Sequence, residues 1–131
     1  MRLKFILITG FALLFAFGTY GQRKLKKANE LYEKFAYSEA VKLYEEVVLD
    51  GNTSDEVIKH MANCYRLIGN SVQAEYWYSL VVELPDAKPI AYYYYYQALK
   101  ENRKYDKALK WMKKYAAIET ADTRAKRELE E

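Results

Sequence analysis

The sequence predicts an all-α protein, and three observations lead to that prediction. The chain has 131 residues, of which 51% are apolar and 30% are charged, so it can form one hydrophobic core and is neither disordered nor collagen-like. It contains only five glycines and two prolines, whereas a sandwich or barrel of many strands needs turn residues about every ten residues. The third observation is a repeat with a period typical of helical hairpins.

The N-terminus has the features of a secretory signal peptide. Two basic residues precede an almost entirely apolar run at 5–17, and Thr19 and Gly21 place small side chains before the expected cleavage site. A helix of that run spans about 20 Å, which is short of the roughly 30 Å hydrocarbon core of a bilayer. We therefore expect cleavage after residue 21 and export to the periplasm. An uncleaved anchor and a buried N-terminal helix are the alternatives.

The chain that remains after cleavage would be nearly neutral. Two of the 21 basic residues lie within residues 1–21, which leaves 19 basic against 18 acidic residues. Nucleic-acid binding needs a concentrated basic stripe that displaces counterions. A nucleic-acid partner is therefore not expected. The short basic cluster at 23–27 is interpreted as a solvated first turn.

A sequence repeat organises the chain. Ala40, Ala74 and Ala108 are equally spaced, at a period of about 34 residues. The same offset aligns Tyr44 with Tyr78 and Met112, Ala28 with Ala62 and Tyr96, and Leu31 with Tyr65 and Leu99. One helical hairpin cannot cover its own apolar face, so the copies must stack, and small alanines allow the helices to approach closely.

These positions resemble the signature of the tetratricopeptide repeat over about residues 22–119. The resemblance implies a right-handed α-solenoid of three helix-turn-helix repeats. The domain boundaries that follow are a signal peptide at 1–21, repeats at 22–53, 54–87 and 88–119, and at 120–131 a polar capping helix or the start of a further region.

Local signals agree with paired helices. Gly51 supplies a residue that tolerates the left-handed conformation found at helix ends. Thr53 with Glu56 has the spacing of a capping box, and Asn70 is suited to cap the helix that follows it. Pro89 is suited to a first helical turn.

Protein–protein recognition is the function that the resemblance implies, in a concave groove lined by the first helix of each repeat. The groove residues are Asn29, Tyr32, Lys59, Asn63, Arg66, Tyr93, Gln97 and Lys100. Asn29, Asn63 and Gln97 recur at the period of the repeat, and a side-chain amide can pair with both the N–H and the C=O of an extended peptide. The alternative is that these are polar groove residues that contact only water.

Five consecutive tyrosines at residues 92–96 form the most conspicuous local feature. At 100° per residue, Tyr92, Tyr95 and Tyr96 share one arc and are predicted to be core residues. Tyr93 and Tyr94 are predicted to face the groove or an edge, where with Tyr32 they would form an aromatic patch for a peptide or a sugar ring. The alternative is a tyrosine-rich core with two exposed rings of no function.

Neither an enzyme nor a metal or cofactor site is expected. The chain has one cysteine and one histidine, Cys64 and His60, which are too few ligands for a closed metal site and lack the third group of a catalytic triad. A glycine-rich phosphate loop and a G-x-S-x-G motif are also missing from the sequence.

The overall arrangement of an export signal followed by tyrosine-rich repeats is similar to the N-terminal part of certain Gram-negative OmpA-like envelope proteins. That resemblance implies a periplasmic scaffold associated with the outer membrane, peptidoglycan or a protein-export machine. The rival hypotheses are a structural spacer in an envelope complex and a carbohydrate-binding helical protein that uses Tyr32, Tyr93 and Tyr94.

Overall fold

The structure, a computed structural model, describes residues 19–130. Every regular element within these residues is a helix, so the prediction of an all-α fold is confirmed. The described chain forms two compact units that divide between Asn52 and Thr53. Most of the predicted signal peptide lies outside the described residues, and its last part, 19–21, belongs to a helix.

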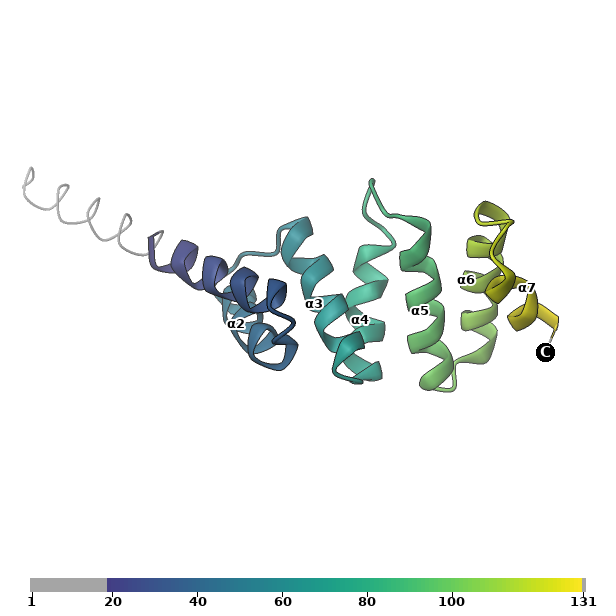
Figure 1. Cartoon of the computed structure of the whole chain (residues 1–131), viewed down its shortest axis with the longest axis horizontal. Coiled ribbons are helices and arrows are strands. Elements are labelled where there is room, and N and C mark those ends of the chain that lie inside the picture. The colour runs from purple at the N-terminus through teal and green to yellow at the C-terminus, as the bar shows by residue number, and fades with distance from the viewer. Residues whose placement is uncertain (1–18, 131) are drawn as a thin grey trace, which may run out of the picture. The chain divides into compact units, whose positions relative to one another are not determined.

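The first unit is a helical hairpin. Its first helix includes residues 19–33, and its second helix, α2, spans Tyr37–Leu49 (Figure 1). The Lys24 ammonium joins the two helices through ion pairs with Glu46 at 3.2 Å and Asp50 at 2.8 Å. Both pairs are partly exposed, so they position the helices more than they stabilise them.

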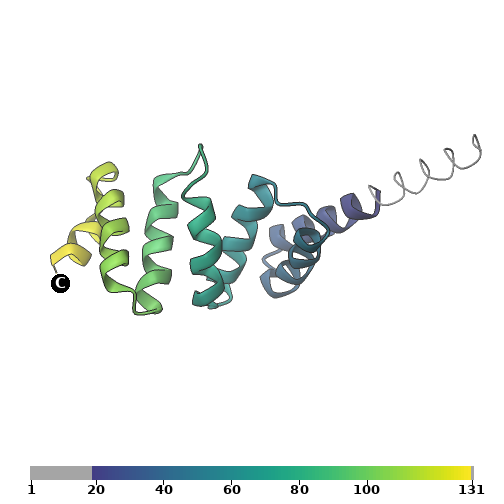
Figure 2. The same cartoon turned by 180° about the vertical axis from the view of Figure 1, so that it is seen from behind.

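The second unit consists of five helices that pack in chain order. They are α3 (Asp55–Leu67), α4 (Ser71–Val81), α5 (Pro89–Glu101), α6 (Tyr105–Ile118) and α7 (Thr123–Glu130). Each helix packs against the next, as both views of the ribbon show (Figure 1, Figure 2). Helices α3, α5 and α7 begin one period apart, so α7 occupies the register of the first helix of another repeat.

The period of the sequence corresponds to like positions in the helices. Ala40, Ala74 and Ala108 lie on α2, α4 and α6 and are 0%, 2% and 2% exposed. Three alanines at one repeat position are buried in three helices, which is what close helix packing requires. The expectation that these alanines are core residues is confirmed.

Helix α3 begins one residue later than the predicted capping box places it. Ser54, and not Thr53, is the N-cap, and its hydroxyl accepts a hydrogen bond from the backbone N–H of Val57 at 3.4 Å. Both residues are good caps, so the pattern alone does not choose between them. The serine satisfies a backbone donor that the first turn of a helix leaves without a partner.

The other predicted helix ends are confirmed. The Asn70 side chain accepts a hydrogen bond from the backbone N–H of Gln73 at 3.1 Å and caps α4. Pro89 occupies the first turn of α5, and Gly51 has a φ of 95°, which a glycine adopts without strain.

The tyrosine run is divided between core and edge differently from the prediction. Tyr95 and Tyr96 are buried as predicted. Tyr92, predicted to be a core residue, is half-buried, with its ring centroid 5.5 Å from that of Trp111. Tyr94 is half-buried, and Tyr93 is buried, contrary to the prediction.

Among residues 19–130, no helix combines the length and the apolar character needed to cross a bilayer.

Candidate functional site

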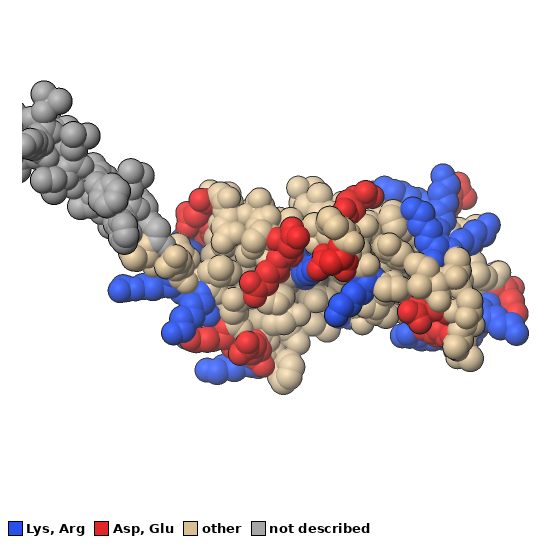
Figure 3. All heavy atoms as spheres, turned by 90° about the horizontal axis from the view of Figure 1, so that it is seen from above, with Lys and Arg blue, Asp and Glu red and all other residues tan. Residues whose placement is uncertain are grey.

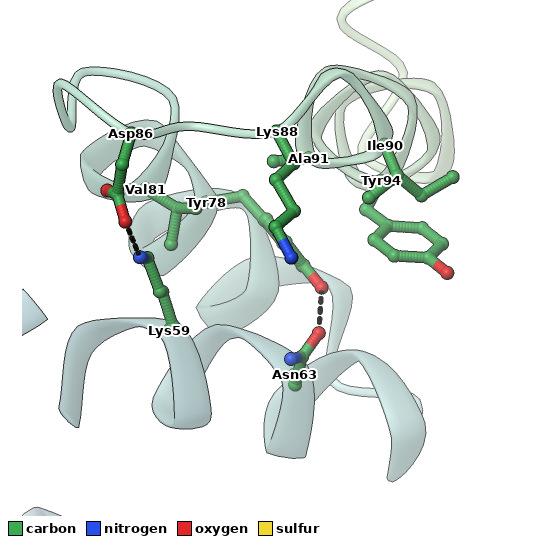
Figure 4. A pocket seen from close by; sticks show the side chains of 9 residues that line it. All are labelled: Lys59, Asn63, Tyr78, Val81, Asp86, Lys88, Ile90, Ala91 and Tyr94. Carbon is green, nitrogen blue, oxygen red and sulfur yellow. Dashed lines mark hydrogen bonds and ion pairs between the residues drawn. The ribbon is translucent and has the colours of Figure 1, made fainter. Parts of the chain in front are cut away.

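A hollow of about 220 Å³ opens in the second unit where α3, α4 and the start of α5 meet (Figure 4). Its walls combine apolar side chains with a few polar and charged ones, which is the usual composition of a binding pocket. The lining residues are Lys59, Asn63, Tyr78, Val81, Asp86, Lys88, Ile90, Ala91 and Tyr94. Two of the predicted groove residues, Lys59 and Asn63, therefore line one hollow.

A hydrogen-bond network fixes the side chains on the floor of this hollow. The Tyr78 hydroxyl donates to Asn63 Oδ1 at 2.6 Å and accepts from Arg66 Nε at 3.0 Å. The Arg66 guanidinium also lies 3.9 Å from the centroid of the Tyr94 ring, at cation–π distance. Tyr78 is 2% exposed, so these bonds hold Asn63 and Arg66 in defined positions.

The bond from Tyr78 also orients the amide of Asn63. Since Oδ1 faces the phenol, Nδ2 is the end of the amide that points away from Tyr78 (Figure 4). The sequence predicts that this amide uses both its donors and its acceptor on a peptide. In the structure, one of the two lone pairs of Oδ1 accepts the hydrogen bond from Tyr78.

Charged side chains border the hollow. Lys59 Nζ lies 2.7 Å from Asp86 Oδ2, and the hydrogen bond from Lys59 holds the pKa of the Asp86 carboxyl below its usual value. The Lys88 side chain extends over the hollow with its ammonium directed toward Tyr78 and Asn63 (Figure 4). With Arg66 beside it, the site has more positive than negative charge.

The first copy contains the same amide–phenol pair. The Tyr44 hydroxyl donates to Asn29 Oδ1 at 2.5 Å, just as Tyr78 donates to Asn63. Both pairs have the same separation along the sequence. The pair is not among the sequence predictions, but this separation, repeated after one period, is the signal in the sequence that indicates it.

The other predicted groove residue of the first unit, Tyr32, packs against aromatic neighbours. Its ring centroid is 5.5 Å from that of Tyr37 and 6.4 Å from that of Tyr44, both in edge-on geometry. Tyr32 and Asn29 are half-buried and belong to the first unit, whereas the other six predicted groove residues belong to the second.

One repeat further on, the part of the hollow that Lys59 borders in the second copy is filled. Tyr93 stands where the second copy has Lys59, and it is 7% exposed. Its ring centroid lies 5.3 Å from that of Tyr115, and the Arg124 guanidinium lies 4.8 Å above its face. The prediction that Tyr93 faces an open groove is therefore wrong, because Tyr115 and Arg124 replace the smaller Val81 and Ile90 and cover the ring.

Polar contacts hold these covering groups in place. The Tyr115 hydroxyl donates to Asp122, and Arg124 Nη2 lies 2.5 Å from Asp122 Oδ2. The hydrogen bonds from Arg124 and Tyr115 hold the pKa of Asp122 well below its usual range. Asp122 therefore stays ionised at neutral pH and anchors the start of α7.

Helix α7 also engages Lys100, a predicted groove residue. Lys100 Nζ lies 2.7 Å from Glu128 Oε2, and the Tyr96 hydroxyl donates to the same carboxylate. The hydrogen bonds from Lys100 and Tyr96 lower the pKa of Glu128. Gln97 is half-buried beside this cluster, and Met112 stands where the second copy has Tyr78, so the hydroxyl that would bond to Gln97 is missing.

Of the two residues considered for metal binding or nucleophilic chemistry, Cys64 lies in the core and His60 is half-buried. Cys64 is fully buried, and burial raises the pKa of its thiol to about 12. A thiol of that kind is not a nucleophile at neutral pH. Within residues 19–130, no three His, Cys, Asp or Glu side chains gather in a way that could hold a metal ion.

Solved structures with the same fold are secretion chaperones. The chain has a tetratricopeptide-like fold. The chaperone SycD of Yersinia enterocolitica type III secretion, in complex with a peptide of the translocator YopD, matches with a TM-score of 0.64 and 15% identity over 83% of this chain and 88% of that chain. Another structure of SycD matches with a TM-score of 0.59 and 14% identity over 86% of this chain and 90% of that chain.

PcrH in complex with the chaperone-binding region of PopB matches with a TM-score of 0.60 and 13% identity over 85% of this chain and 90% of that chain. No family model and no curated protein matches the sequence.

Proposed function

We propose that this protein is a non-enzymatic scaffold that binds an extended segment of a protein partner at the hollow between α3, α4 and α5. The observation that carries the proposal is an open hollow in the second copy whose polar side chains are already held in place by the Tyr78 network. A preorganised site loses less entropy on binding than a mobile one.

The chemistry of the hollow suits a peptide. Val81, Ile90 and the Tyr94 ring offer an apolar surface for one side chain of the partner. Asn63 Nδ2 is a donor for a backbone carbonyl of the partner, and Lys88 is a donor for a carbonyl or carboxylate at its edge.

The structural neighbours support this proposal. SycD was captured with a peptide of YopD, and PcrH was captured with the chaperone-binding region of PopB. In each case a protein of this fold holds a segment of a larger protein. We extend that mode of binding, but not the identity of the partner, to this chain.

We further propose that the protein acts in the periplasm as part of a complex associated with the outer membrane, peptidoglycan or protein export. This placement rests on the predicted signal peptide and on the resemblance to OmpA-like envelope proteins. Fractionation of cells that express the full chain tests it: mature protein that begins at Gln22 in the periplasm supports the placement, and a cytosolic protein that retains Met1 contradicts it.

Peptide binding is tested with two matched amide deletions. Envelope proteins that the mature protein retains are divided into overlapping peptides. Fluorescence anisotropy then measures the affinity of each peptide for the wild type, Asn63→Ala and Gln97→Ala. The two variants remove equivalent amides, one beside the open hollow and one beside the filled position. Loss of one hydrogen bond is worth about 1 kcal/mol, or roughly fivefold in Kd. We expect that loss for Asn63→Ala alone.

Circular dichroism first establishes that Asn63→Ala and Ile90→Asp are folded. If both variants then bind the peptide as tightly as the wild type, binding at this hollow is rejected and the structural spacer becomes the better hypothesis. Binding to envelope glycans that Tyr94→Ala abolishes would favour the carbohydrate hypothesis. The burial of Tyr93 removes one of the three rings on which that hypothesis depends.

A further inference from the structure

The outward face of α6 is strongly basic. At 100° per residue, four lysines of this helix fall within an arc of about 120° that lies opposite its buried residues. The lysines are Lys107, Lys110, Lys113 and Lys114, and all are exposed. Asp106, the one acidic residue of α6, lies within the same arc, so the four lysines leave this face with a net positive charge. We call these four lysines the α6 basic face.

The repeat does not require this basic face. The positions one period earlier, on α4, hold Gln73, Tyr76, Ser79 and Leu80, and those two periods earlier, on α2, hold Glu39, Lys42, Glu45 and Glu46. The same surface is thus without formal charge in the second copy and net acidic in the first. The repeat period therefore does not account for the lysines of α6.

The protein itself leaves part of this charge without a counter-ion. Lys114 Nζ lies 4.0 Å above the Trp111 ring, and Lys107 Nζ lies 5.7 Å from the centroid of Tyr95. Lys110 and Lys113 form no ion pair with any group of residues 19–130. Figure 3 shows lysine and arginine side chains gathered over the C-terminal helices.

Exposed apolar side chains flank the α6 basic face on both sides. Tyr105 and Leu109 lie on one flank and are 60% and 42% exposed. Ile118, which is 54% exposed, and the half-buried Trp111 lie on the other flank. Lysines bordered by tryptophan, tyrosine, leucine and isoleucine have the composition of a surface that lies on a membrane interface.

We propose that the α6 basic face docks on an anionic lipid surface. Protein–protein interfaces are enriched in arginine and depleted in lysine, whereas every cation of α6 is a lysine. Lysine carries a compact charge on a flexible stem, which suits a fluid plane of mobile phosphates. This surface is distinct from the proposed peptide site, because none of the four lysines lines the hollow.

The test measures co-sedimentation of the full chain with two kinds of vesicle. One is phosphatidylcholine alone, and the other is phosphatidylcholine with an equal amount of phosphatidylglycerol. The variant Lys110→Gln/Lys113→Gln is compared with Lys34→Gln/Lys42→Gln, which makes the same change in net charge. Lys42 occupies on α2 the place that Lys110 occupies on α6. All variants keep the apolar run at 5–17, so their differences report the lysines.

We expect stronger binding to the anionic vesicles, which rising salt weakens. Each lysine near an anionic surface contributes about fivefold in affinity, so the α6 double variant should bind roughly twenty-five-fold more weakly. The control variant should be within about twofold of wild type, because its lysines are not part of the α6 basic face.

Equal binding to both vesicles, or an equal loss in the control variant, would overturn the proposal. Binding of soluble polyglutamate without binding of anionic vesicles would assign the face to an acidic protein and overturn it as well. Peptide affinity of the α6 variant is measured alongside. It should stay at the wild-type value, so failure of the lipid proposal is distinguishable from failure of the peptide proposal.

Discussion

The Tyr78→Phe substitution removes one oxygen atom and two hydrogen bonds from the second unit. That oxygen donates to Asn63 Oδ1 at 2.6 Å and accepts from Arg66 Nε at 3.0 Å. A neutral hydrogen bond contributes about 1 kcal/mol, and a bond to a charged group contributes about 1.5–3 kcal/mol. Because Arg66 is half-exposed, the lower value applies to its bond. We expect the free energy of unfolding to fall by about 2.5 kcal/mol.

Urea denaturation followed by circular dichroism measures this loss. Tyr76→Phe is the matched control, because Tyr76 lies on the same helix and is 56% exposed. Its change should stay within about 0.5 kcal/mol. A double-mutant cycle of Tyr78→Phe with Asn63→Ala should give a coupling energy of about 1 kcal/mol. A Tyr78→Phe loss no larger than the control, or no coupling, would refute the assignment of this network as a stabilising element.

Three further predictions concern the core and one ion pair. Ala74→Leu should overpack the buried 2%-exposed site and lower the free energy of unfolding by about 1–3 kcal/mol in urea denaturation, and an unchanged midpoint would contradict close packing there. Cys64 should react with Ellman's reagent at pH 8 only after unfolding, since burial raises its pKa to about 12, and rapid reaction of the native protein would contradict that burial. Burial alone would raise the pKa of Glu75, but hydrogen bonds from Lys104 and Asn102 outweigh it and lower the pKa. The Glu75 carboxylate therefore stabilises the fold above its unfolded pKa of about 4.3, and this contribution is lost as pH falls through the lower folded value. Glu75→Gln should flatten the dependence of the urea midpoint on pH below about 4.5, and an unchanged slope would show that this pair does not contribute.

The elements that the sequence predicted well depend on local chemistry or on the period. Asn70 and Pro89 act within one helical turn, so their residue types alone indicate where α4 and α5 begin. The alanines at 40, 74 and 108 are buried because the period places them at like positions in successive helices.

The errors concern side chains whose surroundings come from another helix. Helical angles separate Tyr93 from Tyr92 by about 100°, but they do not show that Tyr115 of α6 and Arg124 of α7 cover the Tyr93 ring. Likewise, the period aligns Asn63 with Gln97, but it does not show that the tyrosine bonded to the first amide becomes Met112 beside the second. Lys59 and Asn63 line a hollow, and their role in binding stays a prediction.

A few side chains around Tyr93 determine whether this protein has one peptide site or two. Tyr93, Tyr115 and Arg124 stand where the second copy has lysine, valine and isoleucine. Exchanging these three for their counterparts, together with Met112→Tyr to restore the hydroxyl beside Gln97, should open a second peptide site on the same scaffold. A chain with two peptide sites would gain avidity for a partner that offers two matching segments, without any change in the affinity of either site.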